Sequence, residues 1–157
     1  MTLTPDLVLE ALRQNWIWDL RSGNFTQANG HLFHMRVNWR NDVTDIGHCC
    51  IGVWCDRNIP EFRTHIQDSH YNDRLSVVEN GSDYDKWMEI LEIPVKLKQF
   101  LMSMNDGSSL FAHTVDGNTR YYSGVSGSRT DSNLLRAEGA NRKFPFIARF
   151  LEVVWGL

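Results

Sequence analysis

The sequence is poor in the features that mark secreted or membrane-bound proteins. Its 157 residues include only three cysteines, Cys49, Cys50 and Cys55, and four prolines. An odd cysteine count with two cysteines adjacent argues against a disulfide framework. No apolar run approaches the roughly 20 residues that cross a bilayer, and residues 1–6 lack the character of a secretion leader. We therefore expect a cytoplasmic protein without a membrane partner.

An excess of positive charge is also missing. The formal net charge is −3 and the pI is near 6.0, whereas general affinity for nucleic-acid backbone usually shows as a basic excess. The chain contains no phosphate loop of the Gly-Lys-Ser type and no serine in a nucleophile-elbow pattern. From these absences we expect no general nucleic-acid binding and no cofactor. They also favour a protein that is not an enzyme.

The first element that the sequence predicts is a helix near residues 5–22. Thr4-Pro5-Asp6 is a helix-start signal, because threonine caps, proline fits the first position and aspartate faces the positive end of the helix dipole. Val8, Leu12, Trp16 and Leu20 follow four apart, and glycine at 23 can end the helix. Trp16 and Trp18 are candidate binding aromatics, but a tryptophan on such an apolar stripe is more often part of the core.

A strand with a basic outer face is expected over residues 33–40. Phe33, Met35, Val37 and Trp39 alternate there with His34, Arg36, Asn38 and Arg40, a period of two typical of a half-buried strand. That polar face can contact an anion or can simply be solvated. Residues 45–48 are expected to break the strand.

The cysteine stretch from Cys49 to Asp56 is short and apolar enough to be a buried strand or a short helix. We favour a helix, because Cys49, Val53 and Asp56 then share one side and Gly52 admits a neighbouring backbone. Ile59-Pro60 should end it.

The remaining patterns complete an α+β fold in one compact domain, residues 1–157. We expect three to five helices packed with a small antiparallel sheet or hairpins, and an insert at about residues 112–142. The expected elements are a strand at 75–78, a helix at 85–91, a helix after Pro94 that buries Val95, Leu97, Phe100, Leu101 and Met104, a hairpin around Asp116-Gly117, and a last helix that buries Phe146, Ile147, Phe150, Leu151, Val154 and Trp155.

Three segments carry a resemblance to a known family. They are residues 18–32 (WDLRSGNFTQANGHL), residues 49–56 (CCIGVWCD) and Met104-Asn105-Asp106. In this order they resemble a family of small phage and prophage proteins with L-R-S-G-x-[YF]-x-Q, C-C-L-G-V-x-C-D and M-N-D motifs. The resemblance implies a phage-type protein that acts in the host-cell cytoplasm, but it transfers no activity. The long insert after Asp106 departs from the family pattern.

The cysteine stretch offers two further chemistries. His48, Cys49, Cys50 and Cys55 carry zinc-ligating atoms, but adjacent cysteines point apart, so a metal site needs tertiary help. A cysteine hydrolase would need a thiolate activated by histidine at a cleft. Cysteines flanked by Ile, Val and Trp more often behave as small buried hydrophobes. We therefore predict that Cys50→Ser lowers stability before it alters binding.

The insert offers the groups that bind a nucleotide. Arg120, Tyr121, Tyr122 and Arg129 flank a Gly/Ser-rich segment, and together they supply guanidinium groups for phosphate and aromatic faces for a base. A second wall of this ligand site could come from four further residues, within one protomer or across the interface of a homo-oligomer. They are Arg21, Gln27, Arg36 and Arg40.

These observations lead to three hypotheses for function. The first is a non-enzymatic anti-defence protein that sequesters a small anionic ligand, such as a cyclic nucleotide of host immune signalling. The second is an inhibitor that binds a host defence protein directly through an apolar or acidic surface. The third is a phosphodiesterase or cysteine hydrolase.

Overall fold

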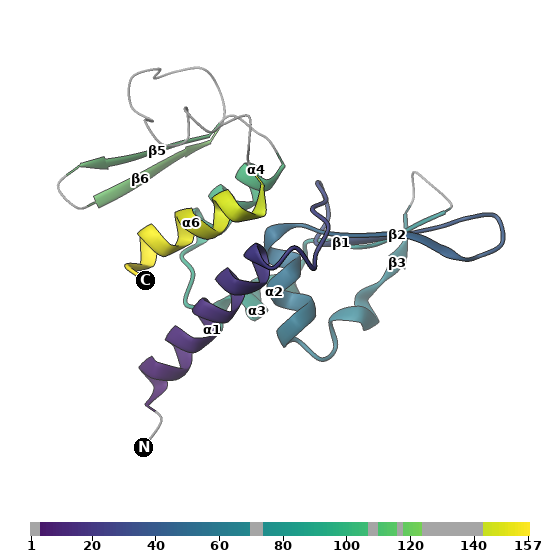
Figure 1. Cartoon of the computed structure of the whole chain (residues 1–157), viewed down its shortest axis with the longest axis horizontal. Helices are drawn as coiled ribbons and strands as arrows, with labels where there is room; N and C mark the ends of the chain where they lie inside the picture. The colour runs from purple at the N-terminus through teal and green to yellow at the C-terminus, as the bar shows by residue number, and fades with distance from the viewer. Residues whose placement is uncertain (1–3, 70–73, 107–109, 116–117, 124–142) are drawn as a thin grey trace.

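The computed structural model describes residues 4–69, 74–106, 110–115, 118–123 and 143–157 (Figure 1). It has the predicted α+β architecture, in which helices pack at one end of an antiparallel sheet. The helices are α1 (Pro5–Arg21), α2 (Cys50–Asn58), the 3-10 helix η1 (Phe62–His65), α3 (Ser82–Glu89), α4 (Val95–Asn105) and α6 (Phe144–Trp155). The strands are β1 (Phe33–Val37), β2 (Val43–His48), β3 (Gln67–Asp68), β4 (Leu75–Val78), β5 (Leu110–Val115) and β6 (Asn118–Ser123).

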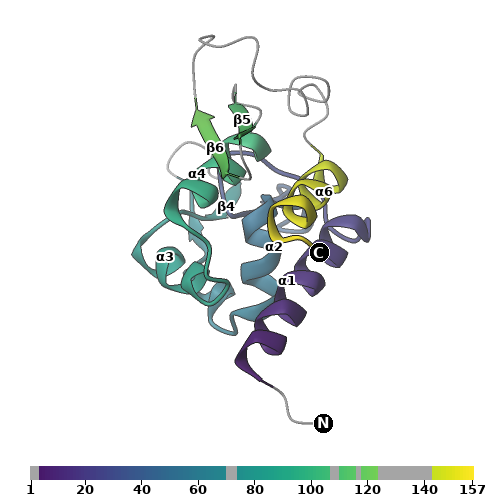
Figure 2. The ribbon, with the colours of Figure 1, turned by 90° about the vertical axis from the view of Figure 1, so that its left-hand side faces the viewer.

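Helix α1 begins and ends as the sequence predicts. The Thr4 hydroxyl accepts a hydrogen bond from the Leu7 N–H at 3.3 Å, and the chain leaves the helix through Gly23 at a φ of +76°. Trp16 and Leu20, in the second half of the helix, are buried in the core. The first half projects beyond the rest of the fold, as Figures 1 and 2 show.

The four-stranded sheet has the order β2-β1-β4-β3, and every pairing is antiparallel. The expectation that residues 45–48 break the strand is wrong, because they form most of β2 and pair with β1 from Phe33↔His48 to Arg36↔Asp45. Gly47 fits there because other groups fill the space of its missing side chain: a Cβ at this position would lie 2.7 Å from the Ala28 Cβ.

The β1–β2 hairpin, residues 33–48, extends away from the helices as an arm (Figure 1). We call it the hairpin arm. The Asn38 side chain accepts hydrogen bonds from the Arg40 and Asp42 N–H groups, at 2.8 and 3.0 Å, and so closes the turn at its tip. Trp39 therefore lies in the turn and not on the buried face of the strand, and 70% of its surface is exposed.

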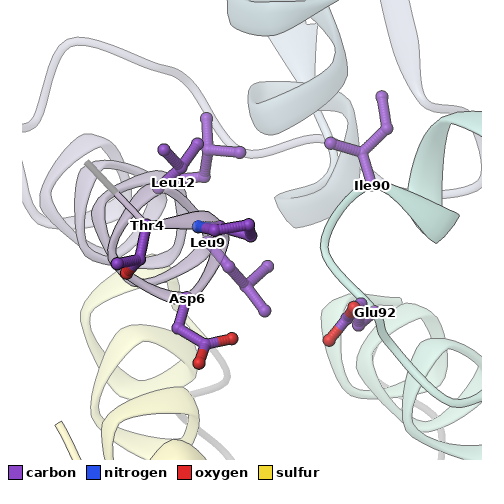
Figure 3. Close-up of a pocket in the computed structure, with 8 residues that line it drawn as sticks. Thr4, Asp6, Leu9, Leu12, Ile90 and Glu92 are labelled. Carbon is purple, nitrogen blue, oxygen red and sulfur yellow. The ribbon is translucent and has the colours of Figure 1, made fainter. Parts of the chain in front are cut away.

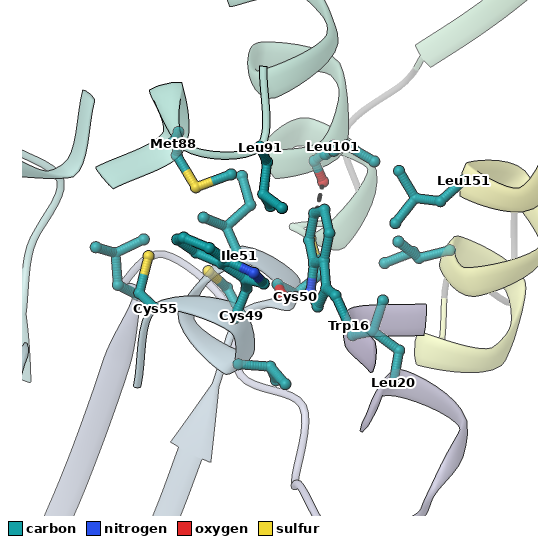
Figure 4. Close-up of a cluster of buried hydrophobic side chains, with 14 of the residues drawn as sticks. Trp16, Leu20, Cys49, Cys50, Ile51, Cys55, Met88, Leu91, Leu101 and Leu151 are labelled. Carbon is teal, nitrogen blue, oxygen red and sulfur yellow. Dashed lines mark hydrogen bonds between the residues drawn. The ribbon is translucent and has the colours of Figure 1, made fainter. Parts of the chain in front are cut away.

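Helix α2 lies at the centre of the core and confirms the prediction of a helix over the cysteine stretch. Cys49 caps it, since its Sγ accepts a hydrogen bond from the Gly52 N–H at 3.3 Å, and Ile59 ends it. A Cβ on Gly52 would lie 1.7 Å from the Leu32 carbonyl oxygen, so the predicted close approach of a backbone is real. Side chains from α1, α3, α4 and α6 surround α2 (Figure 4).

Helices α4 and α6 complete the core. Leu97, Phe100, Leu101 and Met104 are buried as predicted, but Val95, the first residue of α4, is 62% exposed. In α6 the predicted residues Phe146, Ile147, Phe150 and Leu151 are buried, while Val154 and Trp155 are partly buried.

Strands β5 and β6 pair from Leu110↔Ser123 to Val115↔Asn118, which confirms the predicted hairpin. Its turn, Asp116-Gly117, lies outside the described residues. Among the helices of the described residues, none has the length and apolar character needed to span a membrane.

Candidate functional site

The three cysteines lie in surroundings that favour the neutral thiol. Burial raises the pKa of Cys49 to about 12, although the Gly52 N–H opposes this, and burial likewise raises the pKa values of Cys50 and Cys55. The Cys50 thiol donates to the Leu101 carbonyl oxygen at 3.6 Å. A thiol nucleophile needs a lowered pKa and access to substrate, so these cysteines pack as small hydrophobic groups. Within the described part of the chain, no group of three or more His, Cys, Asp and Glu side chains is placed to hold a metal ion.

The three segments of the family resemblance meet at Asn105. Its Oδ1 accepts hydrogen bonds from the Cys50 N–H and from Gln27 Nε2, each at 3.0 Å, and its Nδ2 donates to the Ala28 carbonyl oxygen at 2.7 Å. Gln27 also accepts from the Phe144 N–H at 3.1 Å. Asn105 is buried, and buried polar groups are costly unless they are paired. The motif residues in this network therefore join the start of α2 to the end of α4 and to the start of α6.

A second polar cluster connects the sheet to η1. The Asp56 carboxylate accepts from His48 Nε2 at 2.8 Å and from two nitrogens of Arg63 at 2.8 and 3.0 Å. Burial alone would raise the pKa of Asp56, but the hydrogen bonds from His48 and Arg63 outweigh it and lower the pKa to about 2. Asp56 is thus a structural anion at neutral pH.

The four residues predicted to form a second wall of the ligand site lie in different parts of the fold. Arg21 forms an ion pair with Glu152 of α6, and the amide of Gln27 belongs to the Asn105 network. Arg36 and Arg40 do lie together on the hairpin arm, both exposed. Arg36 lies opposite Asp45 in the strand register, and the Arg40 guanidinium stacks 4.5 Å from the centre of the Trp39 ring.

The predicted insert residues are placed only in part. Arg120, Tyr121 and Tyr122 belong to β6, where their backbones pair with His113, Ala112 and Phe111. Arg129 lies outside the described residues. Binding of a ligand by these residues remains a prediction.

A polar pocket of about 410 Å³ lies between α1 and α2, and its lining combines aromatic, amide and charged groups: Asn15, Trp18, Asp19, Arg57 and Asn58. Its volume falls within the roughly 300–1,000 Å³ of small-molecule sites. Trp18 is 62% exposed, whereas Trp16, two residues earlier, is 1% exposed. The pocket is the candidate functional site.

The charged groups of the pocket are held in place. Arg57 Nε donates to the carboxylate of Asp19 at 3.3 Å, and Asp19 is buried. The two Nη groups of Arg57 have no partner among the described residues, so they remain able to donate to a phosphate or carboxylate in a forked arrangement. Asn58 donates Nδ2 to the Trp54 carbonyl oxygen at 2.9 Å, which fixes its amide at the edge of the pocket. An anion with a flat ring suits this arrangement.

Sequence reasoning did not place a site here, although α1 carried a signal. Residues two apart on a helix are about 200° apart around its axis, so Trp16 and Trp18 cannot both face the core. With Trp16 on the apolar stripe, Trp18 had to face outward, where a large aromatic side chain is unusual. No sequence pattern indicated that Arg57 would pair with Asp19, since they are distant along the chain.

Compared with protein-family models, with curated proteins and with solved structures, the chain matches none at a significant level. The resemblance to phage proteins therefore stays a prediction, and the function is argued from the pocket.

Proposed function

We propose that this protein is a non-enzymatic binder that sequesters a small, nucleotide-like anion in the pocket between α1 and α2. The observation that supports this most is an exposed indole, Trp18, beside a guanidinium group, Arg57, whose Nη groups are unpartnered among the described residues. With the resemblance to phage proteins, the proposal extends to an anti-defence role, in which the captured ligand is an immune signal such as a cyclic nucleotide.

Each group of the pocket has a role in this proposal. A base stacks on the Trp18 ring, because stacking on an aromatic side chain suits any base. The Nη groups of Arg57 donate to a phosphate, and the amides of Asn15 and Asn58 contact polar edges of the ligand. Asp19 holds the guanidinium in position and is a positioning residue. Buried cysteines with raised pKa values favour capture over thiol chemistry.

The test is to incubate the protein with a panel of cyclic mono-, di- and trinucleotides, remove the protein, and then heat the recovered protein to release what it holds. Sequestration predicts that the ligand disappears from solution and returns intact. Trp18→Ala should weaken binding by about 1–3 kcal/mol, the usual effect of losing one stacked base. Arg57→Lys keeps the charge beside Asp19 but loses the fork, and should weaken binding as well.

Trp39→Ala is the matched control, because Trp39 is also an exposed tryptophan next to an arginine but lies on the hairpin arm. It should leave binding unchanged. If Trp39→Ala abolishes capture while Trp18→Ala does not, the ligand binds to the hairpin arm and not to the pocket. A cleaved product would identify an enzyme, and no depletion of any ligand at micromolar protein would contradict the proposal.

A further inference from the structure

A second hollow lies along the first half of α1, where this helix faces the link from α3 to α4 (Figure 3). It has a volume of about 430 Å³. We call it the α1 groove. Its floor and walls are mainly apolar, and the residues that matter here are Asp6, Val8, Leu9, Leu12, Ile90 and Glu92.

The apolar stripe of α1 is longer than the core that covers it. Trp16 and Leu20 are buried, but Val8 is 44% exposed, and Ile90, which also lines the groove, is 50% exposed. Apolar periodicity in a helix usually marks a face that packs against another element. At the first two turns of this stripe, Val8 stays exposed and Leu9 and Leu12 are only partly buried.

The rim of the groove is acidic. Asp6 on α1 and Glu92 on the link from α3 to α4 line it from opposite sides (Figure 3). Neither carboxylate has a hydrogen-bond or ion-pair partner among the described residues. An apolar floor between two free carboxylates favours an occupant with an apolar ridge and flanking positive charges.

Glu92 also has a backbone conformation that residues other than glycine rarely adopt, with a φ of +52°. Strain of this kind tends to persist where a site uses the side chain. A glycine would adopt this turn without strain, yet a glutamate stands there and lines the groove.

We propose that the α1 groove binds a cationic amphipathic helix of another protein. The exposed stretch from Pro5 to Leu12 spans about 12 Å at 1.5 Å per residue, enough for about two turns of a helix laid into the groove with apolar anchors at i, i+3 or i+4, and i+7. Lysine or arginine side chains beside those anchors would meet Asp6 and Glu92. This surface is independent of the α1–α2 pocket and of the function proposed for it.

A second copy of this chain is a poorer occupant. A twofold contact through the groove would bring Asp6 and Glu92 toward the same carboxylates of the partner copy, and like charges in an interface oppose association. The groove therefore favours a partner of opposite charge.

The test uses the full chain and a dye-labelled synthetic helical peptide of leucine and lysine, with fluorescence anisotropy as the readout. A leucine and glutamate peptide with the same apolar pattern is the charge-reversed control. We expect the lysine peptide to bind and the glutamate peptide not to bind. Ile90→Asn, at an exposed site, should weaken binding roughly tenfold or more, since it removes an apolar anchor.

The charges are tested with the double variant Asp6→Asn and Glu92→Asn, since asparagine tolerates the positive φ of residue 92. Its binding should be several-fold weaker at low salt, and the difference should shrink at high salt. Glu92→Gly separates binding from folding, because it should weaken the complex without lowering the melting temperature. Asp42→Asn on the hairpin arm is the matched control and should bind as the wild type does.

Three outcomes would overturn the proposal. They are no binding of the lysine peptide, equal binding of the lysine and glutamate peptides, and equal binding by wild type and Ile90→Asn. A dimer in sedimentation that Ile90→Asn dissociates would assign the groove to a second copy instead.

Discussion

At Gly52, helix α2 and the backbone of Leu32 approach each other closely in the core. A methyl group there would lie 1.7 Å from the Leu32 carbonyl oxygen, and that oxygen belongs to the backbone, so it cannot move aside cheaply. We expect Gly52→Ala to destabilise the fold by about 4 kcal/mol or more, the range of severe overpacking. Urea denaturation measures this. Gly81→Ala is the control, since nothing lies within 4 Å of a Cβ at Gly81, and a similar loss in both variants would contradict the close approach.

Asp56 should make stability depend on pH at acid values. Its pKa is lowered from 3.8 to about 2 in the folded state, so its contribution is complete above the unfolded pKa and is lost as the pH falls from about 4 to 2. The shift corresponds to about 2 kcal/mol. Asp56→Asn should therefore destabilise the protein by about that amount at pH 7, and the difference should fade toward pH 2. Asp45→Asn, at an exposed carboxylate, should have a smaller effect, and a difference independent of pH would argue against the ion cluster.

At the scale of elements, the burial of α2 determines how fast its thiols react. Cys49, Cys50 and Cys55 are buried with raised pKa values, so a thiol reagent should label the native protein only as fast as the fold opens. We expect slow labelling of the folded chain and rapid labelling of three thiols in denaturant. Cys50→Ser should lower the melting temperature while ligand capture persists. Rapid labelling of any native thiol would show that the helix is more open than it appears.

Helix α1 shows which features of a helix can be predicted from its sequence pattern and which cannot. Its cap, its length and the burial of Trp16 follow from local signals, because capping and periodicity depend on near neighbours. The same pattern gave no sign that Val8 would remain exposed, since coverage of a helix depends on what lies opposite. The break predicted at residues 45–48 failed for the same reason: Gly47 pairs with His34 of β1, and Ala28 and His34 fill the space that a side chain at residue 47 would need.

At the scale of the whole molecule, the candidate binding groups are spread over separate surfaces. Arg21 pairs with α6, Gln27 is part of the buried network, and Arg36 and Arg40 lie on the hairpin arm. The pocket between α1 and α2 is lined by the second half of α1, and the α1 groove by its first half. One helix thus contributes to both proposed sites, and variants of Trp18 and Ile90 should affect them independently.

The sequence by itself determined the α+β class, the caps of α1, the end of α2, the hairpin of β5 and β6 and most of the core positions, because these depend on short-range periodicity and on which side chains avoid water. It also marked Gly52 as a site of close approach. Only the tertiary structure decided that Asn105 joins the motif segments, that Arg57 meets Asp19 beside Trp18, and that Asp6 faces Glu92 across an apolar groove. Each of these pairs residues far apart along the chain, and their meeting depends on how the whole fold packs.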